Sequence, residues 1–187
     1  MSRIVHHFDQ QVNADMPMRE EISTAYLGFG SNLGDRAANL LRAVAAISNS
    51  GLRLSALSSI YETDPVDYLD QPVFLNLVAA FEAPRLGPFD LLQLCLQSEE
   101  RLGRKRAIPR GPRIIDIDLL LLGDRIGESV RDGFELIVPH PRMHLRRFVL
   151  APLAEIAPEC VHPVLGRSIR NLLEEAGDSA SVRIYRA

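Results

Sequence analysis

The sequence predicts an α+β domain built on an antiparallel sheet, with a polar site along one strand. Three observations support this class. Helical and extended patterns alternate along the 187 residues, an apolar run at 113–122 carries two aspartates, and basic residues gather directly before that run. A chain of this length is expected to form one domain with a sizeable core. We assign the polar residues 1–22 to an N-terminal extension and residues 23–187 to the domain.

Six segments form the expected core. In chain order they are a strand at 24–30, a helix at 35–49, strands at 52–61 and 73–82, a helix at 88–102 and a strand at 113–122. This order is the βαββαβ arrangement of ferredoxin-like domains, in which the strands pair antiparallel and the helices pack on one face of the sheet. Two C-terminal helical segments, at 149–157 and 168–176, are expected to follow.

Apolar residues at helical spacing support the two core helices. The first ends at the stop signal Asn-Ser-Gly at 49–51, and in the second Leu91 and Cys95 fall on the inward side. Glu99 and Glu100 come late in the second helix, where an acid opposes the helix dipole. We therefore expect one of these two glutamates to pair with an arginine.

Spacing along the strands also assigns residues to faces. Phe74 and Asn76 are two positions apart, so they share a face of their strand. Gly28 and Gly30 are expected to allow a turn or a close approach to the backbone.

The strand at 113–122 carries the chemistry. Asp116 and Asp118 project to the same side, with Cα atoms about 6.5–7 Å apart. Two unpaired carboxylates in an apolar strand would be costly to bury. Residues 101–113 contain six cations and no acid. The simplest partners are a divalent metal on the carboxylates and a polyanion, such as a nucleotide triphosphate, on the arginines. A purely structural salt-bridge pair is the alternative.

The charge distribution agrees with a polyanionic substrate. Residues 101–147 hold eleven Lys/Arg and six Asp/Glu, although the whole chain has a formal net charge of −3. The two cysteines have no motif spacing, no apolar run reaches membrane-spanning length, and the N-terminus lacks a signal-peptide layout. We therefore expect a cytoplasmic protein with reduced thiols and no membrane contact.

Several stretches together resemble a known family. They are Phe29–Asp35, Tyr61–Pro65, Gln71–Asn76, Gly103–Arg106, Gly111–Asp118 and Val138–His140. In this order and at nearly constant spacing, they resemble the 6-hydroxymethyl-7,8-dihydropterin pyrophosphokinases of folate biosynthesis. The resemblance extends from about residue 24 to residue 173. It implies transfer of a diphosphate from ATP to the hydroxymethyl group of the pterin, with release of AMP.

The resemblance also implies roles for individual residues. Asp116 and Asp118 would hold two Mg²⁺ ions between the triphosphate and the attacking hydroxyl, and Arg104 and Arg106 would take part in catalysis. The implied ATP-binding residues are Glu99, Arg104, Arg113, His140 and Arg146. The implied pterin-binding residues are Thr63, Val66, Phe74, Asn76 and Phe148, with the two aromatic rings stacking on the pterin and Asn76 contacting its polar edge.

Two other functions remain open at this stage. A different Mg²⁺-dependent nucleotidyl or phosphoryl transferase would share the aspartate pair but would not explain Phe74, Asn76 and Phe148. A non-catalytic ferredoxin-like module could bind nucleic acid, although carboxylates on its surface would repel phosphate. We expect small-molecule substrates, no nucleic acid partner and a monomer.

Overall fold

Strand β1 (Ile22–Ser31) is an inner strand of the sheet because both of its edges are paired. The computed structural model describes residues 22–66, 68–84, 86–105, 111–131, 134–177 and 180–186. On β1, one edge pairs antiparallel with β4 (Phe74–Pro84) and the other with β5 (Asp116–Leu122). Strands β2 (Arg53–Leu57) and β3 (Tyr61–Thr63) both pair with β4, and β10 (Val182–Ile184) adds to β3.

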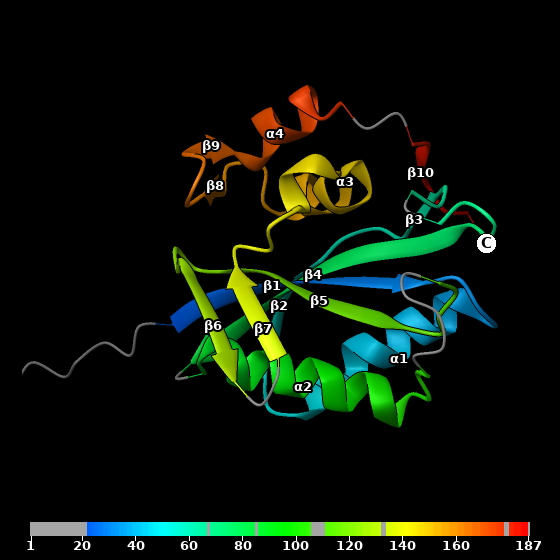
Figure 1. Ribbon diagram of the computed structural model, residues 1–187, viewed down its shortest axis with the longest axis horizontal. Coiled ribbons are helices and arrows are strands. Elements are labelled where there is room, and N and C mark those ends of the chain that lie inside the picture. The colour runs from blue at the N-terminus through cyan, green and yellow to red at the C-terminus, as the bar shows by residue number, and fades with distance from the viewer. Residues whose placement is uncertain are drawn as a thin grey trace, which may run out of the picture.

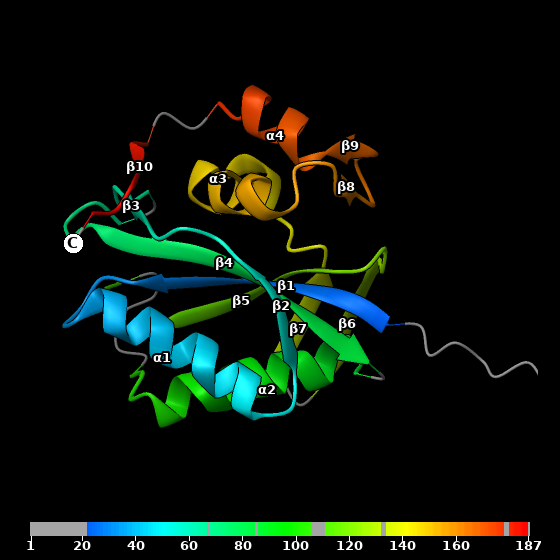
Figure 2. The same ribbon diagram turned by 180° about the vertical axis from the view of Figure 1, so that it is seen from behind.

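The helices cover both faces of this sheet (Figures 1 and 2). Helices α1 (Arg36–Asn49) and α2 (Pro88–Arg101) lie together on one face, as expected for the βαββαβ core. Helices α3 (Arg147–Ile156) and α4 (Ile169–Glu175) lie over the opposite face, after the short 3-10 helix η1 (Met143–Leu145). The ferredoxin-like α+β class with C-terminal helices is therefore confirmed.

Some elements differ from expectation. The segment 52–61 is not one strand, because β2 ends at Leu57 and β3 begins at Tyr61. Between them the Ser58 side-chain oxygen, rather than a backbone oxygen, accepts from the N–H of Val78 in β4. Two hairpins were not predicted. One joins β6 (Gly127–Arg131) to β7 (Phe134–Val138), and the other joins β8 (Val161–His162) to β9 (Arg167–Ser168).

Two apolar clusters fill the space on either side of the sheet. Alternate residues of β1, such as Leu27 and Phe29, pack against α1 and α2 in the larger cluster. The smaller cluster joins Val78 and Leu120 to α3 and α4. It leaves the end of the sheet near Asp116 uncovered by α3, which is where the cavity described below opens. No helix among the described residues has the length and hydropathy that crossing a membrane would require.

The expected N-terminal extension falls almost entirely outside the described residues. Ile22, its last residue, already belongs to β1. Residues 1–21 are not described.

Candidate active site

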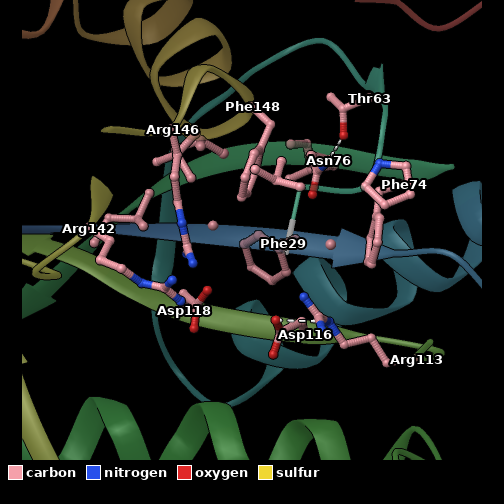
Figure 3. A pocket seen from close by; sticks show the side chains of 18 of the residues that line it. Phe29, Thr63, Phe74, Asn76, Arg113, Asp116, Asp118, Arg142, Arg146 and Phe148 are labelled. Carbon is pink, nitrogen blue, oxygen red and sulfur yellow. Dashed lines mark hydrogen bonds and ion pairs between the residues drawn. The ribbon is translucent and has the colours of Figure 1, made fainter. Parts of the chain in front are cut away.

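A cavity of about 290 Å³ opens between the sheet and the segment that leads into α3 (Figure 3). Strands β1, β3, β4 and β5 supply one wall, and the segment from His140 to Val149 supplies the other. Most of the residues predicted for the site line this cavity. They are Thr63, Val66, Phe74, Asn76, Arg104, Arg113, Asp116, Asp118, His140, Arg146 and Phe148. Arg106, also predicted, lies outside the described residues.

Strand alternation places both aspartates at the cavity. Figure 3 shows Asp116 and Asp118 side by side on β5, while Ile117 between them is buried in the core against the helices. The expected strand at 113–122 begins only at Asp116. Arg113 lies outside it because its backbone N–H and C=O bond to Asn32 rather than to a neighbouring strand.

The two carboxylates have different partners. Asp116 forms ion pairs with Arg104 and with Arg113, whose Nε lies 3.0 Å from Asp116 Oδ2. The carboxylate of Asp118 has no hydrogen bond or ion pair among the described residues, while its backbone pairs with Gly28 of β1. Burial and the charge of Asp116 raise the pKa of Asp118 to about 7. The alternative that the aspartates form structural salt bridges therefore holds for Asp116 without bound ligands, but it does not hold for Asp118.

The donor set suits magnesium supported by phosphate. Among the described residues, no group of three or more His, Cys, Asp or Glu side chains could hold a metal by itself. Mg²⁺ usually binds one or two carboxylates and completes its octahedral shell with water and substrate phosphates. Asp116 and Asp118, with arginines beside them, match that arrangement.

Glu99 lies beneath the site rather than in its lining. It is 3% exposed, it accepts a hydrogen bond of 2.7 Å from the backbone N–H of Ile117, and it pairs with Arg104. Burial, opposed by Arg104, raises the pKa of Glu99 to about 7. The expected pairing of a late α2 glutamate with an arginine is thus observed, and it connects α2 to the start of β5.

The other half of the cavity is aromatic and amidic. Phe148 and Phe74 lie on either side of Asn76 in Figure 3. Asn76 donates a hydrogen bond of 2.7 Å to Thr63 Oγ1. Each ring makes a cation–π contact with an arginine. The guanidinium carbon of Arg113 lies 5.0 Å from the centroid of the Phe74 ring, and that of Arg146 lies 5.5 Å from the centroid of the Phe148 ring. A flat heterocycle with a polar edge would find both stacking surfaces and hydrogen-bonding groups here.

Two glycines of β1 leave room for side chains of the neighbouring strands beside the cavity. A Cβ atom at Gly30 would come within 2.9 Å of Asn76 Oδ1, and one at Gly28 within 3.3 Å of Leu120 Cδ1. The expected close approach to the backbone is therefore made by side chains of the two neighbouring strands.

Three residues in and around the cavity were not given a role from sequence. Asn32 is 2% exposed. Its Nδ2 donates to Gln71 Oε1 (3.0 Å) and Pro72 O (3.1 Å), and its Oδ1 accepts from Arg113 N (2.7 Å). Gln71 and Arg142 line the cavity. Asn32 and Gln71 lie within the matched stretches, but their contacts join segments that only the fold brings together.

His140 is neutral in this environment. Its Nδ1 accepts a hydrogen bond of 3.2 Å from the backbone N–H of Arg142. Burial, together with the charges of Arg146 and Arg142, lowers the pKa of His140 to about 4. The arginines therefore supply the positive charge on this side of the cavity.

Known proteins match most of the chain. The sequence model of the family described as 7,8-dihydro-6-hydroxymethylpterin-pyrophosphokinase matches residues 26–158. A 2-amino-4-hydroxy-6-hydroxymethyldihydropteridine pyrophosphokinase from Bacillus subtilis is 48% identical over 136 residues, which are 72% of this chain and 78% of that protein. A protein of the same name from Methylorubrum extorquens is 42% identical over 164 residues, which are 87% of this chain and 99% of that protein.

Some relatives are much longer. The chain covers 21% of the folic acid synthesis protein fol1 from Schizosaccharomyces pombe, to which it is 38% identical over 162 residues. The crystal structure of wild-type HPPK-DHPS from Plasmodium falciparum aligns with a TM-score of 0.68 and 16% identity, over 85% of this chain and 45% of that one. This structural match supports the fold. On the sequence matches, the chain belongs to the 7,8-dihydro-6-hydroxymethylpterin-pyrophosphokinase family.

Proposed function

We propose that this chain transfers a diphosphate group from ATP to 6-hydroxymethyl-7,8-dihydropterin, giving the pterin diphosphate and AMP in folate biosynthesis. One structural observation carries the proposal beyond family membership. A single cavity joins two aspartates flanked by arginines to a slot between two aromatic rings. Each half suits one substrate, and the hydroxymethyl group would reach from the slot towards the carboxylates.

In this reaction the hydroxyl oxygen attacks the β-phosphorus of ATP. The bond from that phosphorus to the oxygen bridging to the α-phosphorus breaks, AMP leaves, and the hydroxyl proton passes to solvent. Little covalent chemistry is demanded of the protein, so positioning and charge stabilisation supply most of the catalysis.

We assign the nucleotide side of the cavity to the acidic and basic residues. Asp116 and Asp118 would hold Mg²⁺, two ions in our proposal, which neutralises triphosphate charge when bound. Arg104, Arg113 and Arg146 would bind phosphate oxygens, and Arg106 is expected to join them. Neutral His140 can donate a hydrogen bond from Nε2 to the nucleotide. Glu99 would hold Arg104 in place from below.

The pterin would lie between Phe74 and Phe148, with its polar edge against Asn76 and Thr63. Asn76 is 7% exposed and its Nδ2 already donates to Thr63, so a ligand lacking the matching groups would leave the remaining hydrogen-bonding capacity of the amide unused, which gives strong discrimination. Backbone groups at Thr63 and Val66 would complete the edge. We also propose that the protein is a cytoplasmic monomer, in keeping with its free cysteines Cys95 and Cys160.

The test is incubation with ATP, Mg²⁺ and 6-hydroxymethyl-7,8-dihydropterin, with separation of the nucleotides. AMP should form only when all three are present, and EDTA should stop its formation. Formation of ADP would instead indicate an ordinary kinase. AMP released without pterin would favour another nucleotidyl transferase. Calorimetry adds a check, because pterin binding should depend on Mg²⁺ and a non-hydrolysable ATP analogue.

A further inference from the structure

The placement of α3 decides the width of the proposed pterin slot. Phe148 lies in the first turn of α3, whereas Phe74 and Asn76 belong to the sheet. Residues of α3 such as Leu150 and Leu153 pack on the sheet through the smaller apolar cluster. Apolar packing is non-directional, so directional contacts elsewhere on the helix can further define its position along the strands.

A directional contact is made at the other end of the helix by Glu155. Both of its carboxylate oxygens accept from the backbone N–H of Ser59, at 3.1 and 3.0 Å. Ser59 Oγ donates to Oε1 at 2.9 Å, and Tyr61 Oη donates to Oε2 at 2.9 Å. Four hydrogen bonds therefore connect the last turn of α3 to Ser59, which lies between β2 and β3, and to Tyr61, the first residue of β3.

This segment leads directly to the cavity. Ser58 is bonded to Val78 of β4 in both directions, because its N–H donates to Val78 O and its Oγ accepts from Val78 N, each at 3.0 Å. Tyr61 begins β3, and Thr63 ends it at the hydrogen bond with Asn76. Strand β3 therefore connects Glu155, at Tyr61, with the polar edge of the slot, at Thr63.

The chemistry of Glu155 is unusual for its place. An acid in the last turn of a helix opposes the helix dipole, so it needs compensating partners. The hydrogen-bond donors that it meets are a backbone amide and two hydroxyl groups, all uncharged. Burial and the nearby Glu155 carboxylate raise the pKa of Tyr61 to about 12, so the phenol remains a donor at ordinary pH.

We propose that Glu155 is a positioning residue for the pterin, which fixes α3 relative to β3 and so sets the separation of Phe148 from Phe74 and Asn76. It touches neither substrate. The inference rests on the proposed function, because it concerns the pterin half of that site. Of the residues assigned to the nucleotide, only Arg146, the N-cap of α3, would move with Phe148; Asp116, Asp118 and Arg113 do not belong to α3, so nucleotide binding should be much less affected.

The test compares Glu155→Ala, Glu155→Gln and Tyr61→Phe with the wild-type chain. Glu174→Ala, at an exposed glutamate of α4, is the matched control. The dissociation constants of 6-hydroxymethyl-7,8-dihydropterin and of Mg²⁺-bound ATP analogue are measured separately, together with melting temperature. Glu155→Ala should weaken pterin binding about tenfold and change nucleotide binding by less than about twofold.

The two milder variants should grade the effect. Glu155→Gln keeps an oxygen that can accept from Ser59, and Tyr61→Phe loses one hydrogen bond of the four, so both should lie between wild type and Glu155→Ala. Unchanged pterin binding in Glu155→Ala overturns the inference, as does an equal loss of both ligands, which marks a merely structural role. If Glu155→Ala does not fold, unchanged pterin binding in Tyr61→Phe overturns it. Absence of AMP formation by the wild type would instead overturn the proposed function.

Discussion

The two faces of the sheet differ in what their side chains meet. On β4, Leu77 and Phe81 point towards α1 and α2 and are almost fully buried in apolar surroundings. Phe74 and Asn76, on the other face of the same strand, line the cavity. Because alternate residues share a backbone, stability and substrate binding are assigned to neighbouring positions of one strand. Substitutions on the two faces should therefore separate the two properties.

The largest effect is expected at Asp118, a half-buried aspartate on the cavity face. Asp118→Ala should lower the rate of AMP formation about a thousandfold or more, because charge stabilisation by metal is worth several kcal/mol. Asp124→Ala, at an exposed aspartate just beyond β5, should leave the rate unchanged. The measurement is AMP release at saturating substrates.

Asp118→Asn provides a second readout on the same residue. It removes a partly desolvated carboxylate next to the charge of Asp116, so the melting temperature without substrates should rise while activity is lost. Normal turnover in either Asp118 variant would remove this residue from the metal site.

On the opposite face, Phe81→Ala should act on stability alone. Phe81 is fully buried in the larger apolar cluster, and deleting such a ring costs about 3–5 kcal/mol in the free energy of unfolding. Chemical denaturation measures the loss. Pterin affinity, measured well below the transition, should stay close to wild type. A large change in pterin affinity would mean that the two faces are not separable.

Phe148→Ala should show the reverse behaviour. Loss of stacking should weaken pterin binding by about 1–3 kcal/mol, if the pterin stacks as nucleobases do. Calorimetry with a non-hydrolysable ATP analogue present measures the change. A pterin dissociation constant equal to that of wild type would place Phe148 outside the binding site.

The smallest expected effect distinguishes two glycines on the same face of β1. Gly30→Ala would bring a methyl group against the amide oxygen of Asn76, so that amide must move and pterin binding should weaken about tenfold. Gly28→Ala meets only the Leu120 side chain, at 3.3 Å, and should weaken pterin binding less. Equal pterin affinities in the two variants would argue against a fixed Asn76.

Much of the fold follows from local patterns. The βαββαβ order came from periodicity and stop signals, and alternation alone placed Asp116 and Asp118 on one side. Strands β6 and β10 were missed because short, exposed strands carry little apolar pattern. Strand β7 buries Leu136 and Val138, but five residues are too few for their pattern to identify a strand alone. At the break between β2 and β3, the Ser58 side-chain oxygen accepts from the backbone N–H of Val78 in β4, a contact between segments distant in sequence.

The candidate site was likewise predictable where it depends on local pattern and not where it depends on contacts between distant segments. Residue types and family motifs indicated most of the cavity lining, but the partners of those residues could not be inferred locally. Asn32 joins segments that are about 40 and 81 positions away, and Glu155 bonds to residues more than 90 positions earlier. Their side chains are ordinary in sequence, and only the packed fold reveals that their hydrogen-bonding groups are satisfied.

The ion pairs of Asp116 bear on how the substrates should arrive. Arg104 and Arg113 must release this carboxylate before it can bind a cation. A divalent ion without nucleotide gives the two guanidinium groups no new hydrogen-bond acceptor. Triphosphate oxygens do offer them new acceptors. Metal and nucleotide should consequently show strong positive thermodynamic coupling, each tightening the other's association by the same factor. The resting protein should then have little affinity for magnesium by itself.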